Sequence, residues 1–250
     1  AALFIALLFG SLPLSASQIF DALISPQPDV TGDVVWKLRL PRVLAAFACG
    51  GLLATSGVLL QVLLRNPLAD PYILGISGGA ALGALTALLM GAGIAGGNAG
   101  ALAGALISIA IVFALSFRAG DWNLHRLLLT GVVLSAGFTA VISLLLTVAP
   151  QAQLRGMLFW LMGDLSNAES SGVAWLVLAL CVGGFTMWSR SLDALAMGAL
   201  KARALGVAVG AMQAALYFSA ATATVAGGPY AITPSAATGG TFTASNYNIT

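Results

Sequence analysis

Residues 72–117 read YILGISGGAALGALTALLMGAGIAGGNAGALAGALISIAIVFALSF, without one charged side chain. A water-soluble domain rarely carries so long an uncharged run, because about a quarter of the residues in an average soluble protein are charged. A bilayer offers another setting, since its hydrocarbon core is about 30 Å thick and each helix that crosses it needs about 20 apolar residues. The stretch therefore predicts two membrane helices, separated by a tight turn in the glycine-rich segment 91–100.

A dense polar segment, RNPLADP at residues 65–71, stands directly before this run. Pro67 and Pro71 stop helix propagation, and each pushes its preceding residue toward extended backbone. Asn66 can cap a turn, and Gly78 and Gly79 allow close backbone approach just downstream. On these residues alone, the segment is explained by a rigid loop that leads the chain into the two helices.

The whole composition points to the membrane. Charged residues make up 7% of the chain, the mean hydropathy is +0.99, and the net charge of +2 implies no basic face for nucleic acid. We expect an all-α polytopic transmembrane helix bundle in contact with the lipid bilayer. The expected spans are residues 1–14, 43–64, two within 72–117, 127–148, 172–189 and 204–226. The first begins without a preceding basic region, which favours a membrane helix whose start is missing over a signal peptide.

Small residues recur within these spans at helical spacing. Gly75, Gly79 and Gly83 share one predicted helix face, as do Gly96, Gly100 and Gly104. Such patterns let helix backbones approach closely in lipid, where tight packing drives association. They predict that neighbouring helices touch, and they do not by themselves indicate transport.

No predicted span holds an Asp, Glu, Lys, Arg or His near its middle. A charge at mid-bilayer costs at least about 2.5–3.5 kcal/mol and is kept mainly for function, so the pattern argues against proton-coupled carriers and intramembrane proteases. Cys49 and Cys181 lie in apolar runs and form no Cys-x-x-Cys or Cys/His cluster, which favours small buried side chains. We therefore predict neither a metal site nor a cofactor. The sequence shows no clustered nucleophile, base or metal ligands that would support an enzymatic activity.

Lysine and arginine residues in the loops give a weak orientation signal. If the first helix leaves the cytoplasm, the outside loops hold Lys37, Arg39, Arg42 and Arg155. The inside loops then hold Arg65, Arg118, Arg126, Arg190, Lys201 and Arg203. The basic bias therefore favours this orientation, with the acidic residues of the segment before residue 43 outside.

A second polar segment, residues 192–206, lies between two predicted spans. Leu192, Leu195, Ala199 and Ala202 repeat at helical spacing, while charged residues such as Lys201 can reach water. The pattern predicts a short amphipathic helix. It could lie on the lipid surface or fit a groove on a partner protein.

Taken in order, these segments resemble the FecCD-type permease family, the membrane subunits of ABC importers for iron-siderophores, haem and cobalamin. The resemblance covers about residues 4–226, and the Asn-Pro-Leu-Ala stretch followed by Leu-Gly-x-Ser is its most specific part. The matching motifs are RLPR at 39–42, Ser56-Gly57 with Gln61, RNPLADP at 65–71, LGISGGA at 74–80, Leu127–Leu129 with Gly131, WLMG at 160–163, Met197-Gly198 and Leu205-Gly206.

The resemblance implies a type II importer fold, in which this chain holds about seven of ten helices. It implies a homodimer around a central path, cytoplasmic ATPase subunits, a periplasmic solute-binding protein and location in the cell inner membrane. Arg39 and Arg42 match arginines that meet acidic residues of the binding protein, and Leu124 and His125 fall near the cytoplasmic gate. For His125, a solvated loop histidine is the favoured interpretation.

The resemblance also assigns residues to two loops. The motif loop comprises Asn66, Pro67, Leu68, Ala69, Pro71 and Gly75. The residues expected to couple the chain to the ATPase are Leu195, Met197, Gly198, Ala199, Lys201, Ala202, Leu205 and Gly206. The chain departs from the family at Ala199, where an acidic residue is frequent, which would remove one polar contact to the ATPase.

A larger departure follows residue 226. We expect a permease domain at residues 1–226 and a polar, low-complexity tail at 227–250, which is too poor in apolar residues to span a bilayer. This end is typical of a truncated or frame-shifted subunit. Two alternatives to an ABC importer permease remain open: a non-transporting membrane fragment, and an ATP-independent channel or carrier.

Overall fold

The protein is a long helical bundle in its computed structural model, which describes residues 2–10, 12–25, 29–118, 121–122, 124–163, 165 and 172–227. The helical elements are α1 (Ala2–Leu8), α2 (Ala16–Ile24), α3 (Val30–Asp33), the π-helical η1 (Val34–Arg39), α4 (Leu40–Leu64), the 3-10 helix η2 (Pro71–Leu74), α5 (Ile76–Leu89), α6 (Gly93–Ser116), α7 (Leu124–Val148), α8 (Gln151–Met162), α9 (Gly172–Ala196), α10 (Ala199–Ala204) and α11 (Val209–Gly227). The two-residue strands β1 (Phe117–Arg118) and β2 (Asp121–Trp122) pair antiparallel.

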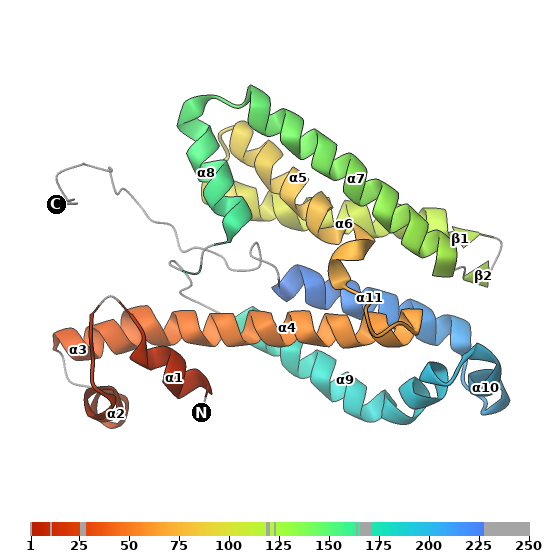
Figure 1. The fold of residues 1–250 in the computed structure, drawn as a ribbon, viewed down its shortest axis with the longest axis horizontal. Helices are drawn as coiled ribbons and strands as arrows, with labels where there is room; N and C mark the ends of the chain where they lie inside the picture. The colour runs from red at the N-terminus through yellow and green to blue at the C-terminus, as the bar shows by residue number, and fades with distance from the viewer. Residues whose placement is uncertain are drawn as a thin grey trace.

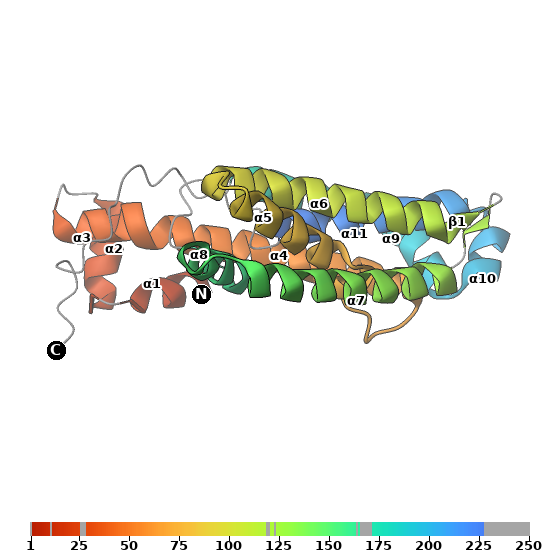
Figure 2. The ribbon, with the colours of Figure 1, turned by 90° about the horizontal axis from the view of Figure 1, so that it is seen from above.

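Helix α4 forms the axis of this arrangement and runs along most of the length of the molecule (Figure 1). It packs against α9 and α11, while α5, α6 and α7 form a second group beside it. Figure 2 shows the same elements from above as a shallow, elongated bundle. The main buried cluster joins both groups through residues such as Leu60 of α4, Ala105 of α6 and Tyr217 of α11.

The expected all-α membrane bundle is confirmed. Four helices in the described residues are long and apolar enough to cross a membrane: Val30–Leu64, Ala95–Ser116, His125–Val148 and Gly172–Ala196. A shorter apolar helix covers Ile76–Leu89. The predicted polar tail begins at the last residue of α11, and residues 228–250 lie outside the described residues.

Several predicted boundaries require correction. The described part of the first predicted span contains only the seven-residue α1, which ends at Leu8. The turn between α5 and α6 occupies only residues 90–92, and the rest of the glycine-rich segment belongs to α6. Residues 151–162 form α8, although the sequence predicts a loop around Arg155.

The segment before residue 43 is also helical, although a loop was predicted there. Asp29 begins α3, because its Oδ1 accepts a hydrogen bond from the Gly32 N–H at 2.7 Å. Exposed Asp33 and Lys37 form an ion pair of 2.7 Å one turn later. Pro41 has no N–H to donate, and the wider π-helical turns of η1 end at Arg39, two residues before it, so the helix continues through the proline.

The α5–α6 contact confirms the small-residue pattern for four glycines. A Cβ added to Gly79 would lie 2.6 Å from the Ser108 Cβ and 2.7 Å from the Gly104 carbonyl oxygen. Gly83 and Gly100 meet through their backbones in the same way. Only residues without side chains permit two helices to approach so closely. Gly75 belongs to a different contact, because it faces α7.

A buried hydroxyl pair joins α4 to α11. The Ser56 hydroxyl donates to the Ala220 carbonyl oxygen at 2.9 Å and lies 2.5 Å from the Thr224 hydroxyl oxygen. Thr224 donates in turn to the same carbonyl of Ala220 at 2.8 Å. Both side chains are almost completely buried. This polar contact therefore specifies how the two helices pack in an otherwise apolar interface.

We expect Ser56→Ala to lower the free energy of unfolding by about 0.6–1.7 kcal/mol, from the average to the maximum value measured for hydrogen bonds between membrane helices. Unfolding in mixed detergent micelles, followed by circular dichroism, measures the difference. Thr55→Ala is the matched control, because the Thr55 hydroxyl bonds only to the Gly51 carbonyl of its own helix. Equal stability of the two variants would contradict a role for Ser56 in joining α4 to α11.

Candidate functional site

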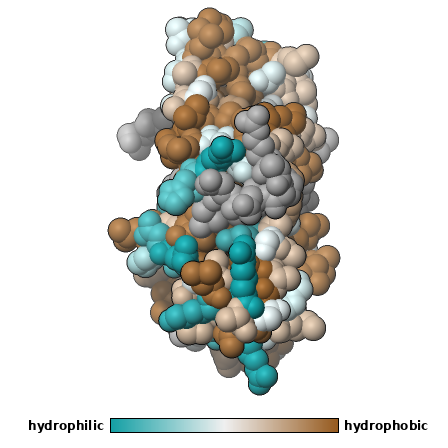
Figure 3. Space-filling model, turned by 90° about the vertical axis from the view of Figure 1, so that its right-hand side faces the viewer, coloured by the Kyte–Doolittle hydropathy of each residue, from teal (hydrophilic) through white to brown (hydrophobic). Residues whose placement is uncertain are grey.

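The motif loop, the predicted gate residues and the predicted coupling segment lie at one end of the bundle. The end of α4, the start of α7, the β1–β2 pair and α10 all lie at the right-hand end of Figure 1. Exposed basic residues of these and neighbouring segments are Arg65, Arg126, Arg190, Lys201 and Arg203. Viewed end-on in Figure 3, this face shows hydrophilic side chains among apolar ones. We call it the basic end of the bundle.

The motif loop between α4 and α5 is built from local hydrogen bonds. Arg65 ends α4 in the left-handed conformation with φ 49°, and the Asn66 N–H donates back to the Gln61 carbonyl at 3.1 Å. The Asn66 Oδ1 accepts from the Leu68 N–H at 2.9 Å, and the Asp70 Oδ1 accepts from the Tyr72 N–H at 2.7 Å. Each polar residue of the motif therefore closes one turn, as the sequence predicted for a rigid loop.

Burial divides the motif loop into an anchored part and an outward part. Ala69 is buried in the main cluster, whereas Leu68 is 85% exposed. Gly75 ends the loop with φ 72°, and a Cβ there would lie 3.2 Å from the Gly131 carbonyl oxygen of α7. The Gly75 carbonyl also accepts the Ser108 hydroxyl of α6 at 3.0 Å. Gly75 thus joins the loop to both neighbouring helices.

The predicted coupling segment forms two helices, where the sequence suggested one. Helix α9 continues to Ala196, the chain turns at Gly198 with φ 116°, and α10 follows. The Gly198 N–H donates to the Leu195 carbonyl at 3.0 Å, and the Gly198 carbonyl accepts from the Ala202 N–H at 3.0 Å. A second glycine with positive φ, Gly206 at 80°, follows α10. We call residues 192–206 the α9–α10 hairpin.

The repeating apolar residues of this hairpin face inward. Leu195 and Ala202 are buried in the main cluster, and Leu192 and Ala199 pack against it. The apolar side chains that the hairpin presents outward are Met197, Leu200 and Leu205, which are 56%, 84% and 65% exposed. Leu200 was missed in the sequence because it lies off the inward repeat. Its lone position between Ala199 and Lys201 is the signal that could have revealed it.

At Gly198 the hairpin meets Arg65, the residue that directly precedes the motif loop. A Cβ added to this buried glycine would lie 3.4 Å from the Arg65 Nη1. The structure therefore brings together two segments that are more than a hundred residues apart in the chain. Because Arg65 also ends α4, the hairpin touches the end of the central helix.

Helix α7 carries a polar feature that the sequence analysis missed. The hydroxyls of Thr139, Ser143 and Thr147 follow one another at four-residue spacing and are exposed. Each donates to the carbonyl four residues earlier, at 2.8, 2.9 and 2.8 Å. Each hydroxyl hydrogen is therefore already donated to a carbonyl of the same helix, and the hydroxyl oxygen can still accept a hydrogen bond from another molecule. We call these residues the hydroxyl row. The regular spacing of Ser and Thr was its signal in the sequence.

The hydroxyl row lies on the least buried of the four candidate spans. Exposed apolar residues, including Val133 and Leu144, occupy other positions of the same helix. Lipid hydrocarbon offers no hydrogen-bond donors, so the hydroxyl oxygens of the row make no favourable polar contact with it. The row is therefore suited to a path or an interface that contains polar groups.

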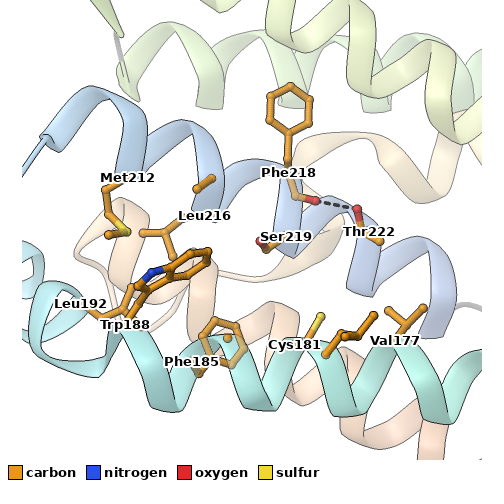
Figure 4. Close-up of a pocket in the computed structure, with 13 residues that line it drawn as sticks. Val177, Cys181, Phe185, Trp188, Leu192, Met212, Leu216, Phe218, Ser219 and Thr222 are labelled. Atoms are coloured by element: carbon orange, nitrogen blue, oxygen red, sulfur yellow. Dashed lines mark hydrogen bonds between the residues drawn. The ribbon is translucent and has the colours of Figure 1, made fainter.

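A groove between α9 and α11 is apolar by contrast. Figure 4 shows Phe185 and Trp188 of α9 opposite Met212 and Leu216 of α11. Its volume is about 320 Å³. The Thr222 hydroxyl in its lining donates to the Phe218 carbonyl of its own helix at 2.8 Å. This lining provides mainly apolar contact, and its polar side chains are Cys181, Ser219 and Thr222.

These features place the polar loops at one end of a membrane bundle and a hydroxyl row along one of its spans. The sequence profile of the FecCD transport family matches residues 1–229. The chain belongs to the FecCD transport family. The resemblance expected from the sequence is therefore confirmed.

Curated relatives of this FecCD chain include import permeases for different solutes. The molybdate import system permease protein MolB of Haemophilus influenzae is 34% identical over 181 residues, 71% of this chain and 54% of MolB. The vitamin B12 import system permease protein BtuC of Escherichia coli O157:H7 is 34% identical over 178 residues, 69% of this chain and 54% of BtuC. The chain thus spans about half the length of the curated relatives it matches.

A solved structure supports the same fold. A protein described as an inward-facing metal-chelate type ABC transporter superposes with a TM-score of 0.77 and 32% sequence identity. The match covers 93% of the FecCD chain and 72% of the solved chain. The helices described above are therefore arranged as in the superposed part of that solved chain.

The two residues predicted to dock a binding protein lie far from the basic end of the FecCD chain. Arg39 is only 8% exposed, and its guanidinium donates to the Leu7 carbonyl at 2.7 Å and to the Leu12 carbonyl. Arg42 is exposed, beside Phe47 and residues of α1. A guanidinium bonded to two backbone carbonyls has little freedom to meet a partner. The docking prediction therefore rests mainly on Arg42.

The predicted gate residues begin α7 at the basic end. Leu124 is the first residue of the helix, and its side chain lies outside the described residues. His125 follows it and is exposed. Both residues lie close to the β1–β2 pair, and their gating role stays a prediction.

Proposed function

We propose that this chain is the permease subunit of an ABC importer in the cell inner membrane. Its membership of the FecCD transport family carries the proposal. The membrane-spanning helices provide the body of such a subunit, and the described residues contain no cluster of three or more His, Cys, Asp or Glu side chains that could hold a metal ion. ATP hydrolysis on a partner would then supply the energy, by shifting the population between outward-open and inward-open states.

The hydroxyl row of α7 supports a route for the solute. In a homodimer, two exposed α7 helices can face each other, so that Thr139, Ser143 and Thr147 of each copy line a shared path. Their oxygens accept hydrogen bonds and carry no charge, so a large polar solute can slide past without being held tightly. Several weak contacts along a path satisfy the requirement that a solute must both enter and leave.

The proposed solute is an iron-siderophore or a related metal chelate, such as haem or cobalamin. BtuC, a relative named for vitamin B12, and the solved metal-chelate type transporter support this class. The molybdate permease MolB is as similar in sequence, so a small oxyanion is the second candidate. Transport assays with both kinds of solute distinguish the two.

Two partners follow from the proposal. Cytoplasmic ATPase subunits would bind the basic end, where Met197, Leu200 and Leu205 of the α9–α10 hairpin point outward. Exposed apolar side chains on a short helix suit a groove in a partner protein. A periplasmic solute-binding protein would dock at the opposite end, near Arg42, whose charge would mainly steer its approach.

We expect a Thr139→Val, Ser143→Ala, Thr147→Val triple variant to slow uptake of the chelate by about tenfold. The variant removes hydrogen bonds from the hydroxyl row to the solute, each worth about 0.5–1.5 kcal/mol. The loss of two or more such bonds can account for a tenfold slower uptake, since 1.36 kcal/mol corresponds to a factor of ten in rate. Uptake is measured in proteoliposomes that hold the full-length protein with its ATPase and binding protein. Stability should not fall, because these side chains are exposed and bond only to their own helix.

Val141→Thr, an isosteric change at an exposed position of the same helix, is the control and should leave uptake unchanged. Wild-type uptake by a folded triple variant would rule out the α7 route. If the unmodified complex moves neither chelates nor molybdate, the assignment as a permease for these solutes fails. Molybdate uptake alone would replace the chelate as the solute.

A further inference from the structure

The far end of the bundle carries a small helical unit that the transport function does not explain. Helices α1 and α2 pack on η1 around Leu7, Ile19, Ala22 and Val35, which form a separate buried cluster. The Trp36 Nε1 donates to the Ala22 carbonyl at 2.8 Å. Arg39 holds the end of α1 through the Leu7 carbonyl. The long helix that contains α4 therefore forms side-chain hydrogen bonds to the backbones of both short helices.

Helix α2 lies across the long helix. In Figure 1 it is seen almost end-on beside α3, and in Figure 2 it runs at a steep angle to α4. A capping box begins it: the Gln18 N–H donates to the Ser15 Oγ at 3.3 Å, and the Ser15 N–H donates to the Gln18 Oε1 at 2.9 Å. Because α4 crosses the membrane, α2 lies close to the membrane plane.

The bundle covers only part of the apolar surface of α2. Ile19 and Ala22 face the buried cluster, whereas Phe20 and Ile24, one turn apart, are 56% and 63% exposed. On the remaining side, Asp21 lines a polar hollow that includes Ser25 and Asp29. The helix thus has a buried apolar side, an uncovered apolar side and a polar side.

The position along the long helix sets the depth of α2. From Arg65 at the basic end to Trp36, the helix rises about 43 Å at about 1.5 Å per residue. A bilayer is about 40–45 Å thick when its headgroup regions are included. Trp36 and α2 therefore lie at headgroup level on the opposite side of the membrane, where aromatic residues of membrane proteins gather.

The long helix beside the α1–α2 unit also exposes apolar side chains. Leu38 and Phe47, on the long helix, are 49% and 48% exposed and lie within or beside its membrane-spanning part. We propose that α2 is an interfacial helix, in which Phe20 and Ile24 insert into the headgroup region of the bilayer while Asp21 faces water. The bound partner is the lipid surface itself.

This assignment gives the α1–α2 unit a role. An interfacial helix resists movement into hydrocarbon or into water, because either exposes one of its sides to the wrong solvent. Trp36 and Arg39 transmit that resistance to the long helix, whose depth and tilt are then set at this end. The inference depends on the membrane-spanning fold and is independent of the solute that is moved.

Site-directed spin labelling in lipid nanodiscs tests the proposal. Cys49 and Cys181 are replaced by alanine in the full-length protein, and single cysteines are introduced by Phe20→Cys, Ile24→Cys and Asp21→Cys. Nitroxide accessibility is measured with oxygen, which concentrates in lipid, and with a water-soluble nickel chelate. Val133→Cys on exposed α7 provides the reference inside the hydrocarbon core.

We expect the ratio of oxygen to nickel accessibility at positions 20 and 24 to exceed that at position 21 severalfold, and to remain below that at position 133. Nickel accessibility at positions 20 and 24 equal to that at 21 would place this side of α2 in water and overturn the proposal. Low accessibility to both reagents at positions 20 and 24 would show that protein, such as a second copy, covers the helix, and would overturn it equally.

Discussion

Gly83→Leu is expected to prevent accumulation of the folded bundle. A Cβ at this position would already overlap the Gly100 backbone of α6, and the Gly104 Cα lies 3.1 Å from it. The obstacle is backbone, which cannot rotate away as a side chain can. Added methylenes in a well-packed interior cost about 1–3 kcal/mol even where neighbours yield, so a leucine against backbone should cost more. Monodisperse yield from size-exclusion chromatography in detergent measures the loss.

Gly137→Leu is the matched control for this prediction. Gly137 also lies inside an apolar helix, but a Cβ there meets no atom within 4 Å. Both substitutions remove a glycine from a helix and should gain helix propensity equally. A Gly83→Leu protein that elutes and melts like Gly137→Leu would show that α5 and α6 do not pack through their glycines.

Leu200→Glu is expected to abolish stimulation of the ATPase while leaving the subunit folded. Leu200 is 84% exposed on α10, so the isolated subunit loses little packing. In the proposed complex the same side chain enters an apolar groove of the ATPase, where an unpaired carboxylate costs several kcal/mol. ATP hydrolysis by the reconstituted complex, with and without loaded binding protein, measures coupling.

Met90→Glu provides the control for Leu200→Glu. Met90 is 82% exposed in the turn between α5 and α6, away from the basic end, and the change in charge is the same. It should leave stimulation intact. Normal stimulation in a correctly inserted Leu200→Glu protein would remove the α9–α10 hairpin from the ATPase contact. Loss of stimulation in both variants would indicate a general effect of added charge.

Much of the fold follows from local sequence because lipid imposes a simple rule. A helix that crosses hydrocarbon must satisfy its backbone internally and present apolar side chains, so uncharged runs reveal spans directly. Residues 127–148 were predicted as a span, and the structure places α7 there with three further residues at its start. The glycine spacing likewise predicted close packing, which Gly79, Gly83, Gly100 and Gly104 confirm.

The motif loop was also predictable, because its chemistry is local. Proline and Asx turns act within a few residues, and the Asn66 and Asp70 side chains each close a turn on a backbone N–H two residues later. The sequence predicts one helix for the coupling segment, and the observed hairpin of two helices was harder to predict. It depends on one glycine, Gly198, whose φ of 116° few other residues adopt.

The sequence by itself determined the membrane class, the spans of strongest hydropathy, the rigid loop and the family. Tertiary structure alone decided which side of each element is covered: Arg39 turned inward onto two carbonyls, Leu195 and Ala202 turned into the core, and Leu200 was left outside. It also decided that the hydroxyl row of α7 is exposed. The reason is that hydropathy reports the preference of a segment for lipid, whereas the facing of a side chain depends on neighbours distant in the chain.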